Sequence, residues 1–213
     1  MPSVGQEQTT EARLTRRALF LEYATIAWNV GEAVLTITLG SIAGSLALIG
    51  FGTVSIVEVF ASSVVVWHVR SGDDGDHHGR TGLALRLIAG AFALLALALM
   101  TAAVGDLTSG RQAGESPWGI AYLAITAVVM FSLAILKRRT ATSLGSEPLH
   151  SEATVTFLDG VLSTTTLVGL ALNAYAGWWW ADPTAALLVG IAALNEARET
   201  WNEARLTQQA LRL

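Results

Sequence analysis

Cysteine is absent from this chain of 213 residues, and charged residues make up only 14% of it. Without cysteine there is neither a disulfide nor a thiolate metal site, so any metal must be bound by histidine, carboxylate, amide or hydroxyl groups. A soluble domain usually has about 25% charged residues. Here 52% of the residues are hydrophobic and the mean hydropathy is positive. The composition therefore predicts an integral membrane protein.

Long apolar stretches occur six times, each near the roughly 20 residues that a membrane-spanning helix needs. A polar, cytoplasmic N-terminal tail of residues 1–17 precedes them and ends in a basic cluster. The first apolar run is too long for the core of a signal peptide, so we interpret it as an uncleaved span. The predicted spans are residues 18–39, 42–69, 82–105, 118–136, 150–176 and 178–194. We expect an all-α six-transmembrane-helix domain over residues 18–205, with a short cytoplasmic C-terminal tail at 206–213.

Basic residues are distributed unevenly between the links that join these spans. We compare the first, third and fifth links with the second link, the fourth link and the two termini. One set contains only Arg111, whereas the other set and the termini include Arg70, Arg80 and the run Lys137, Arg138 and Arg139. Basic residues concentrate in cytoplasmic loops. The distribution predicts a multi-pass protein of the cell membrane with both termini in the cytoplasm.

Carboxylates lie well inside two of the apolar spans. Glu58 occurs near the middle of the second span, flanked at three and four residues by Ser55 and Ser62. The fifth span has Asp159, and Glu152 lies seven residues earlier, two turns away on the same face and about 10 Å along the axis. Both helices therefore present a polar stripe that includes a carboxylate.

Such acids can coordinate a cation, carry protons or hold the bundle together by hydrogen bonds. We expect no lysine or arginine inside the membrane to neutralise them, because Arg86 can extend its side chain to the interface. A transiently bound cation or a proton is then the natural partner of these carboxylates. Desolvation makes a carboxylate hold a proton more readily, which favours proton exchange.

Two stretches of the chain resemble a known family. The sequence SIAGSLALIGFGTVSIVEVFASSVVVW resembles the second transmembrane helix of the cation diffusion facilitator family. The sequence FLDGVLSTTTLVGLALNAYAGWWWADPTAALLVGI resembles its fifth and sixth helices. The resemblance implies a homodimeric exporter of cation diffusion facilitator type, in which a divalent cation, often zinc, binds between helices two and five and is commonly exchanged for protons.

The family has a histidine or aspartate and an aspartate four residues apart on each of these two helices. At the matching positions this chain has Val54 with Glu58 and Val155 with Asp159, so two of the four positions are aliphatic. Side chains at these positions alone cannot form a tetrahedral zinc site. Other oxygen donors would complete the shell, and such a shell suits manganese or magnesium better than zinc. The candidates are Glu152, Ser55, Thr156, Asn29 or water.

Further candidate ligands lie outside these two helices. Glu32 and Asn29 of the first span could face the same cavity, whereas Glu22 is interpreted as a solvated or capping residue. His77 and His78, in the acidic loop RSGDDGDHHGR, either capture metal or belong to a flexible acidic loop. His150, at the start of the fifth span, either guides ions or is simply solvated.

The leading hypothesis is a secondary transporter that exports a divalent cation (zinc, manganese or iron) in exchange for protons. The alternative is a family relative that binds a metal or a partner without transport. We find no nucleotide or lipid-headgroup motif and no nucleophile with a base, so we expect neither an enzyme nor an organic cofactor. The expected partners are a metal ion, protons, the bilayer and a second copy of the chain contacted through helix three, but no nucleic acid.

Overall fold

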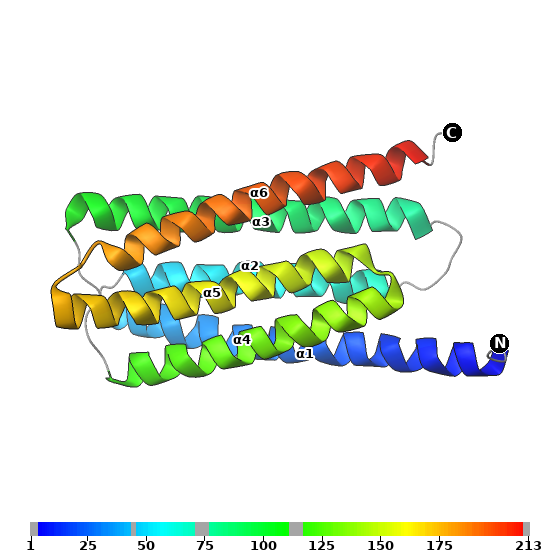
Figure 1. Cartoon of the computed structure of the whole chain (residues 1–213), viewed down its shortest axis with the longest axis horizontal. Coiled ribbons are helices and arrows are strands. Elements are labelled where there is room, and N and C mark those ends of the chain that lie inside the picture. The colour runs from blue at the N-terminus through cyan, green and yellow to red at the C-terminus, as the bar shows by residue number, and fades with distance from the viewer. Residues whose placement is uncertain (1–3, 44–45, 71–76, 111–116, 211–213) are drawn as a thin grey trace.

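The computed structural model describes residues 4–43, 46–70, 77–110 and 117–210, and Figure 1 shows that they form a bundle of long helices. The helices run alternately in opposite directions, so the described chain begins and finishes at the same end of the bundle, which we call the terminal end. The predicted all-α, six-helix membrane bundle is confirmed. The helices are α1 (Val4–Ala43), α2 (Leu46–Arg70), α3 (His77–Ser109), α4 (Pro117–Leu144), α5 (Glu147–Ala176) and α6 (Ala181–Ala210).

Several helices extend beyond the predicted spans. Helix α1 begins at Val4 rather than at residue 18, because the polar segment before the first span also adopts helical structure. Helix α4 continues through the basic run Lys137, Arg138 and Arg139, so these residues are helical and do not form a loop. Helix α6 continues past the apolar region to Ala210, as its helix-forming residues predict. We expect the parts of α1, α4 and α6 that extend beyond the predicted spans to lie outside the bilayer.

The turn between α4 and α5 is short. Gly145 has a φ of 63°, a left-handed conformation that glycine adopts readily at the end of a helix. The Ser146 amide donates to the Ala141 carbonyl at 3.1 Å, and the His150 amide donates to the Ser146 carbonyl at 3.1 Å. These bonds fix α4 and α5 as an antiparallel pair, which places Lys137 and Glu152 at similar depth.

Helices α3 and α6 pack mainly on each other and lie along one side of the bundle in Figure 1. Their contact is apolar and includes small residues: a Cβ on Gly190 would lie 3.0 Å from Met100 Cγ and 3.3 Å from Leu99 Cβ. Close approach of small residues is typical of helix packing in lipid. Small residues of α3 such as Ala91 and Ala96 are thus buried within the chain. Gly90, Ala93, Ala102 and Gly105 of the same helix are exposed, so the dimer contact through helix three stays a prediction.

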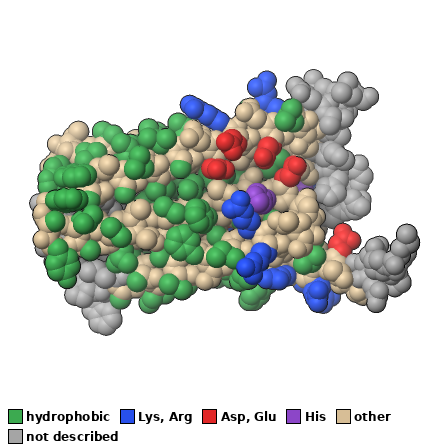
Figure 2. All heavy atoms as spheres, viewed as in Figure 1, with side chains coloured by type: hydrophobic (Ala, Val, Ile, Leu, Met, Phe, Trp, Pro, Cys, Tyr) green, Lys and Arg blue, Asp and Glu red, His purple; other side chains and the backbone are tan. Residues whose placement is uncertain are grey.

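Hydrophobic side chains are spread along the surface visible in Figure 2, whereas Lys, Arg, Asp, Glu and His side chains gather toward the terminal end. Large exposed residues such as Phe20, Leu97 and Val128 suit a lipid environment. Within the described residues, three segments are long and apolar enough by composition to cross a membrane: Gly52–Arg70, Gly79–Ser109 and Ala121–Leu144. The other three helices are more polar, because α1 and α5 carry buried acids and α6 has a charged continuation.

Candidate functional site

Five carboxylate side chains are buried inside the bundle. They are Glu22, Glu32, Glu58, Glu152 and Asp159, and each is at most 2% exposed. Polar residues recur at spacings of three and four on α1 and α5, so each helix has one polar face. These faces turn inward toward α2 and α4. The acids form three clusters that follow one another along the bundle.

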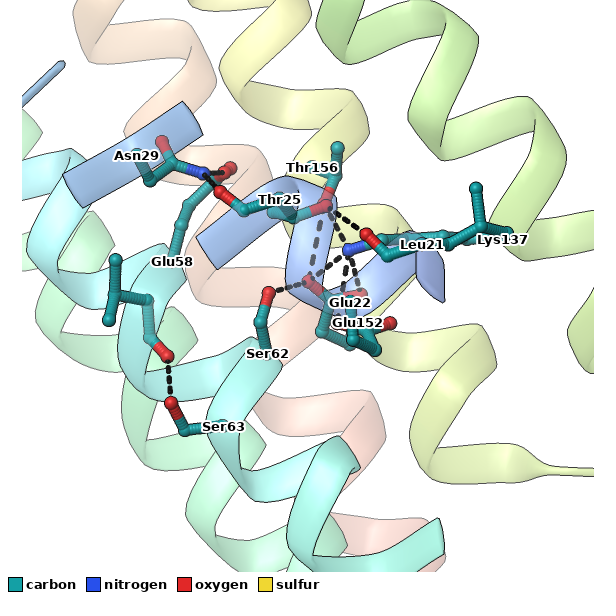
Figure 3. A network of polar contacts seen from close by, with 11 residues as sticks. Leu21, Glu22, Thr25, Asn29, Glu58, Ser62, Ser63, Lys137, Glu152 and Thr156 are labelled. Atoms are coloured by element: carbon teal, nitrogen blue, oxygen red, sulfur yellow. Dashed lines mark hydrogen bonds and ion pairs between the residues drawn. The ribbon is translucent and has the colours of Figure 1, made fainter. Parts of the chain in front are cut away.

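The lysine cluster, closest to the terminal end, consists of Glu22, Ser62, Lys137, Glu152 and Thr156 (Figure 3). The Lys137 ammonium donates to both carboxylate oxygens of Glu152 at 2.7 Å and to Glu22 Oε2 at 3.2 Å. It also donates to Thr156 Oγ1 at 3.3 Å, while Ser62 Oγ donates to Glu152 Oε1 at 2.8 Å. The cluster joins α1, α2, α4 and α5 around one buried positive charge.

This cluster corrects two predictions. Glu22 is neither solvated nor a cap, since it is 0% exposed and forms an ion pair with Lys137. A lysine does lie inside the bundle, because Lys137 is also 0% exposed and pairs with Glu152. A buried charge is tolerated when it is paired and hydrogen-bonded, and both conditions hold here.

The sequence contains a signal that Lys137 is buried. Buried residues recur along α4 at spacings of three and four, and Lys137 continues that series between Ala134 and Ala141. Arg138 and Arg139 beside it are exposed. The two arginines that follow Lys137 suggest a charge at the membrane interface. The spacing of Lys137 from Ala134 and Ala141, however, places it on the buried face of α4.

The carboxylate pair, our name for Glu58 of α2 and Asp159 of α5, lies next along the bundle. The two acids lie close enough to repel each other electrostatically when both are charged. Asn29 of α1 donates from Nδ2 to Glu58 Oε2 at 2.8 Å and to the Thr25 carbonyl at 3.1 Å (Figure 3). This arrangement places Glu58 between α1 and α5.

Five oxygen atoms around the carboxylate pair have no hydrogen-bond partner among the described residues. They are Glu58 Oε1, Asn29 Oδ1, Ser163 Oγ and both carboxylate oxygens of Asp159. Each buried polar atom left without a partner costs about 1–3 kcal/mol, and more when it is charged. Such a group is explained by a bound ion, a proton or water. All five atoms are oxygen donors, the type that hard divalent cations prefer.

The tyrosine cluster lies on the other side of the carboxylate pair from the lysine cluster. Glu32 Oε1 accepts from the Tyr122 hydroxyl at 2.7 Å and from Thr126 Oγ1 at 3.4 Å, while Glu32 Oε2 accepts from Ser55 Oγ at 3.1 Å. Electrostatic repulsion also links Glu32 with Asp159. Within the described structure, the side-chain donors to the Glu32 carboxylate are all hydroxyl groups.

The structure therefore brings together most of the predicted site residues, but in different groups. Glu58, Asp159 and Asn29 share one cluster, Ser55 and Glu32 share another, and Glu152 belongs to the lysine cluster. Val54 and Val155, which stand where the family has metal-binding side chains, are buried in the hydrophobic core and provide no polar atom. Across the described residues no group of three or more His, Asp and Glu side chains is arranged to hold a metal.

The predicted histidine ligands lie near the ends of helices. His77 and His78 begin α3, but their side chains lie outside the described part, as do Asp73, Asp74 and Asp76. His150 is exposed at the start of α5. Metal capture by the acidic loop therefore stays a prediction.

The fold is thus a six-helix membrane bundle with buried carboxylates on its first, second and fifth helices. A profile of the cation efflux transmembrane domain matches residues 23–206. The chain belongs to the cation efflux family.

A relative from Synechocystis sp. is described as an uncharacterized transporter and is 28% identical over 192 residues. That match covers 86% of this chain but 60% of the relative. The chain thus spans less than two thirds of the length of this curated relative.

Proposed function

We propose that this protein exports a divalent metal cation from the cytoplasm in exchange for protons, with Glu58 and Asp159 as the principal ligands. The observation that carries the proposal is the set of five unpartnered oxygen atoms that Glu58, Asp159, Asn29 and Ser163 contribute. Asn29 Oδ1 and Ser163 Oγ supply neutral donors, and water completes the shell. Glu152 is excluded from our ligand set because both of its oxygens accept from Lys137.

The donor chemistry favours a hard cation. Neither Val54 nor Val155 provides a ligand, and no thiolate is available in a chain without cysteine. Zinc sites are commonly tetrahedral with nitrogen and sulfur donors, whereas manganese and magnesium accept oxygen shells of higher coordination number. We therefore propose manganese or magnesium ahead of iron and zinc.

Proton exchange is supported by the proximity of the two acids. Two buried carboxylates near each other repel when both are ionised, and a proton bound to one of them removes that repulsion. A divalent cation instead stabilises the doubly ionised pair. Binding of metal and binding of protons are then mutually exclusive at the same two side chains, which is the requirement for exchange.

The charge distribution supports an arrangement in the cell membrane with both termini in the cytoplasm. Arg70, Arg80 and Lys137 to Arg139 lie toward the terminal end. We also propose a homodimer that forms through exposed apolar helix faces. Cross-linking of the protein in membranes tests this arrangement.

A non-transporting relative that binds metal is the second candidate. It is supported by the aliphatic residues Val54 and Val155 at two of the four positions that bind metal in the family. It predicts metal binding without metal flux.

The decisive experiment is flux into sealed vesicles that contain the purified protein. Manganese, magnesium, iron and zinc are each supplied with and without a pH gradient. We expect flux of at least one ion, a response to the pH gradient, and loss of flux in Glu58→Gln and Asp159→Asn. Glu199→Gln, which removes an exposed carboxylate on α6, is the matched control and should transport normally.

Normal flux in Asp159→Asn would show that the ligand assignment is wrong. Metal binding that requires both acids but produces no flux for any ion would favour the second candidate.

A further inference from the structure

The Lys137 ammonium occupies a site with the features of a cation-binding site. Four oxygen atoms surround it at 2.7 to 3.3 Å: both carboxylate oxygens of Glu152, one of Glu22 and the hydroxyl of Thr156. The carboxylates come from α1 and α5, and the lysine comes from α4. Two buried carboxylates facing each other without a lysine would attract a free divalent cation.

The lysine cluster is aligned with the carboxylate pair. Glu152 precedes Asp159 by seven residues on α5, and Glu22 precedes Asn29 by seven residues on α1. Seven residues are two helical turns, about 10 Å. On α2, Ser62 follows Glu58 by one turn in the same direction. All three helices therefore place the lysine cluster between the carboxylate pair and the terminal end.

We propose that Lys137 is a tethered cation that closes the terminal side of the Glu58–Asp159 site, and that an ion from that side enters only after the ammonium has left Glu152. The inference rests on the proposed function for the identity of the site. The ammonium forms ion pairs with the two carboxylates that an incoming cation meets first. It also connects α4 to α1 and α5, so the helices around the site stay together.

The cluster provides an alternative position for the displaced ammonium. Glu22 accepts from Lys137 only through Oε2, and Glu22 Oε1 has no partner among the described residues. Lysine has a flexible four-carbon side chain, so its ammonium can shift toward Glu22. A divalent cation near Glu152 repels the ammonium and competes for the same carboxylate oxygens. The ion itself thus favours opening of the cluster.

Thiol labelling measures this closure without any metal or transport. The natural chain has no cysteine, so a single introduced cysteine gives an unambiguous signal. Val155→Cys is a near-isosteric reporter one turn from Asp159 toward the terminal end, and Val155 is 0% exposed. Membrane vesicles of both orientations are treated with a membrane-impermeant maleimide. We expect slow labelling while Lys137 is present.

Two variants open the cluster in different ways. Lys137→Met removes the ammonium. Glu152→Gln removes the ion pair between α4 and α5 and leaves one buried ammonium paired with one buried carboxylate, Lys137 with Glu22. We expect each to raise the labelling rate of the Val155→Cys reporter at least about tenfold from the terminal side, equivalent to about 1.4 kcal/mol. Arg139→Met removes an exposed charge two residues away and should leave the rate unchanged.

Unfolding is distinguished from opening by a second reporter. Ala91→Cys lies in the core of α3 at 0% exposure, and global loss of structure would expose it as well. If Lys137→Met labels both reporters, the charge-balanced Glu152→Gln decides the result. Unchanged labelling of the Val155→Cys reporter in Glu152→Gln would overturn the proposal. Because no ion is present, failure of metal flux in the transport assay would leave this result intact.

Discussion

Lys137 of α4 donates to both carboxylate oxygens of Glu152 of α5 at 2.7 Å, and neither side chain is exposed to solvent. Glu22 of α1 also accepts from the same ammonium at 3.2 Å. One positive charge therefore serves two carboxylates from two different helices. This relationship gives Lys137 a structural role in addition to the role proposed for it in ion entry.

The stability of the bundle should depend on Lys137. Lys137→Met leaves Glu22 and Glu152 without a cation, and removing one partner of a buried ion pair costs about 3–5 kcal/mol. Glu152→Gln should cost less, because one ammonium and one carboxylate remain paired. Thermal unfolding in detergent, followed by helical circular dichroism, measures the difference. Arg139→Met should stay within about 0.5 kcal/mol of the natural chain, and equal stability of Lys137→Met would contradict the observed pairing.

Restoring the family ligands should convert the site to a zinc site. Val54→Asp with Val155→His, together with Glu58 and Asp159, provides four ligands for tetrahedral zinc. We expect zinc affinity in detergent to rise at least about tenfold, or about 1.4 kcal/mol, by calorimetry. The metal-free variant should be less stable by about 1–3 kcal/mol, because the new polar groups are buried.

Glu58→Gln on the same background provides the control for that design and should cancel the gain. Unchanged zinc affinity in the double variant would mean that the two valines do not face the carboxylate pair.

Gly52 of α2 lies close to Thr36 and Ile37 of α1. A Cβ there would lie 2.5 Å from Ile37 Cγ1 and 2.6 Å from Thr36 Oγ1, so Gly52→Ala should destabilise the protein by about 1–3 kcal/mol. Gly90→Ala is the matched control, since a Cβ at Gly90 meets no described atom within 4 Å. Alanine in a helix interior should stabilise there by about 0.5–1 kcal/mol. Opposite shifts in the unfolding temperature are expected, and a stabilising Gly52→Ala would contradict the packing of α1 on α2.

Glu203, on the charged continuation of α6, should make stability depend on pH. Partial burial raises the pKa of Glu203, and repulsion from Glu147, Glu199 and Glu196 raises it further. A carboxyl whose pKa is higher in the folded protein lowers stability as pH rises from the unfolded pKa through the folded pKa. Glu203→Gln should therefore raise the unfolding temperature by about 1–2 °C at pH 7.

The effect of Glu203→Gln should disappear near pH 3, where the carboxyl is protonated in both states. Glu11→Gln, an exposed acid on α1, is the charge-matched comparison. An increase that is as large at pH 3 as at pH 7 would show that charge repulsion is not its cause.

The six-helix fold could be predicted because each helix is specified by its own stretch of sequence. Apolar runs of suitable length and polar links appear directly in the sequence, and the bilayer admits few structures besides helices. Helix ends were less predictable: α1 extends to Val4, because a polar segment next to a span can continue the same helix at little cost. The basic run at Lys137 was assigned to a link for the same reason.

The carboxylate pair was also predictable, since Glu58 and Asp159 lie deep in their spans and their helical spacing fixes the polar face. The pairing of Glu22 and Lys137 was not predictable by the same reasoning. Each lies near the end of a span, where a charge can be buried or solvated, and the partner that decides this is on another helix. Only the packing of α1 against α4 brings them together.

Helix α1 contributes one residue to each of the three clusters: Glu22 to the first, Asn29 to the second and Glu32 to the third. Its 40 residues extend about 60 Å, twice the roughly 30 Å thickness of the hydrocarbon layer. A rotation or axial shift of this single rod therefore changes all three sets of contacts in one movement.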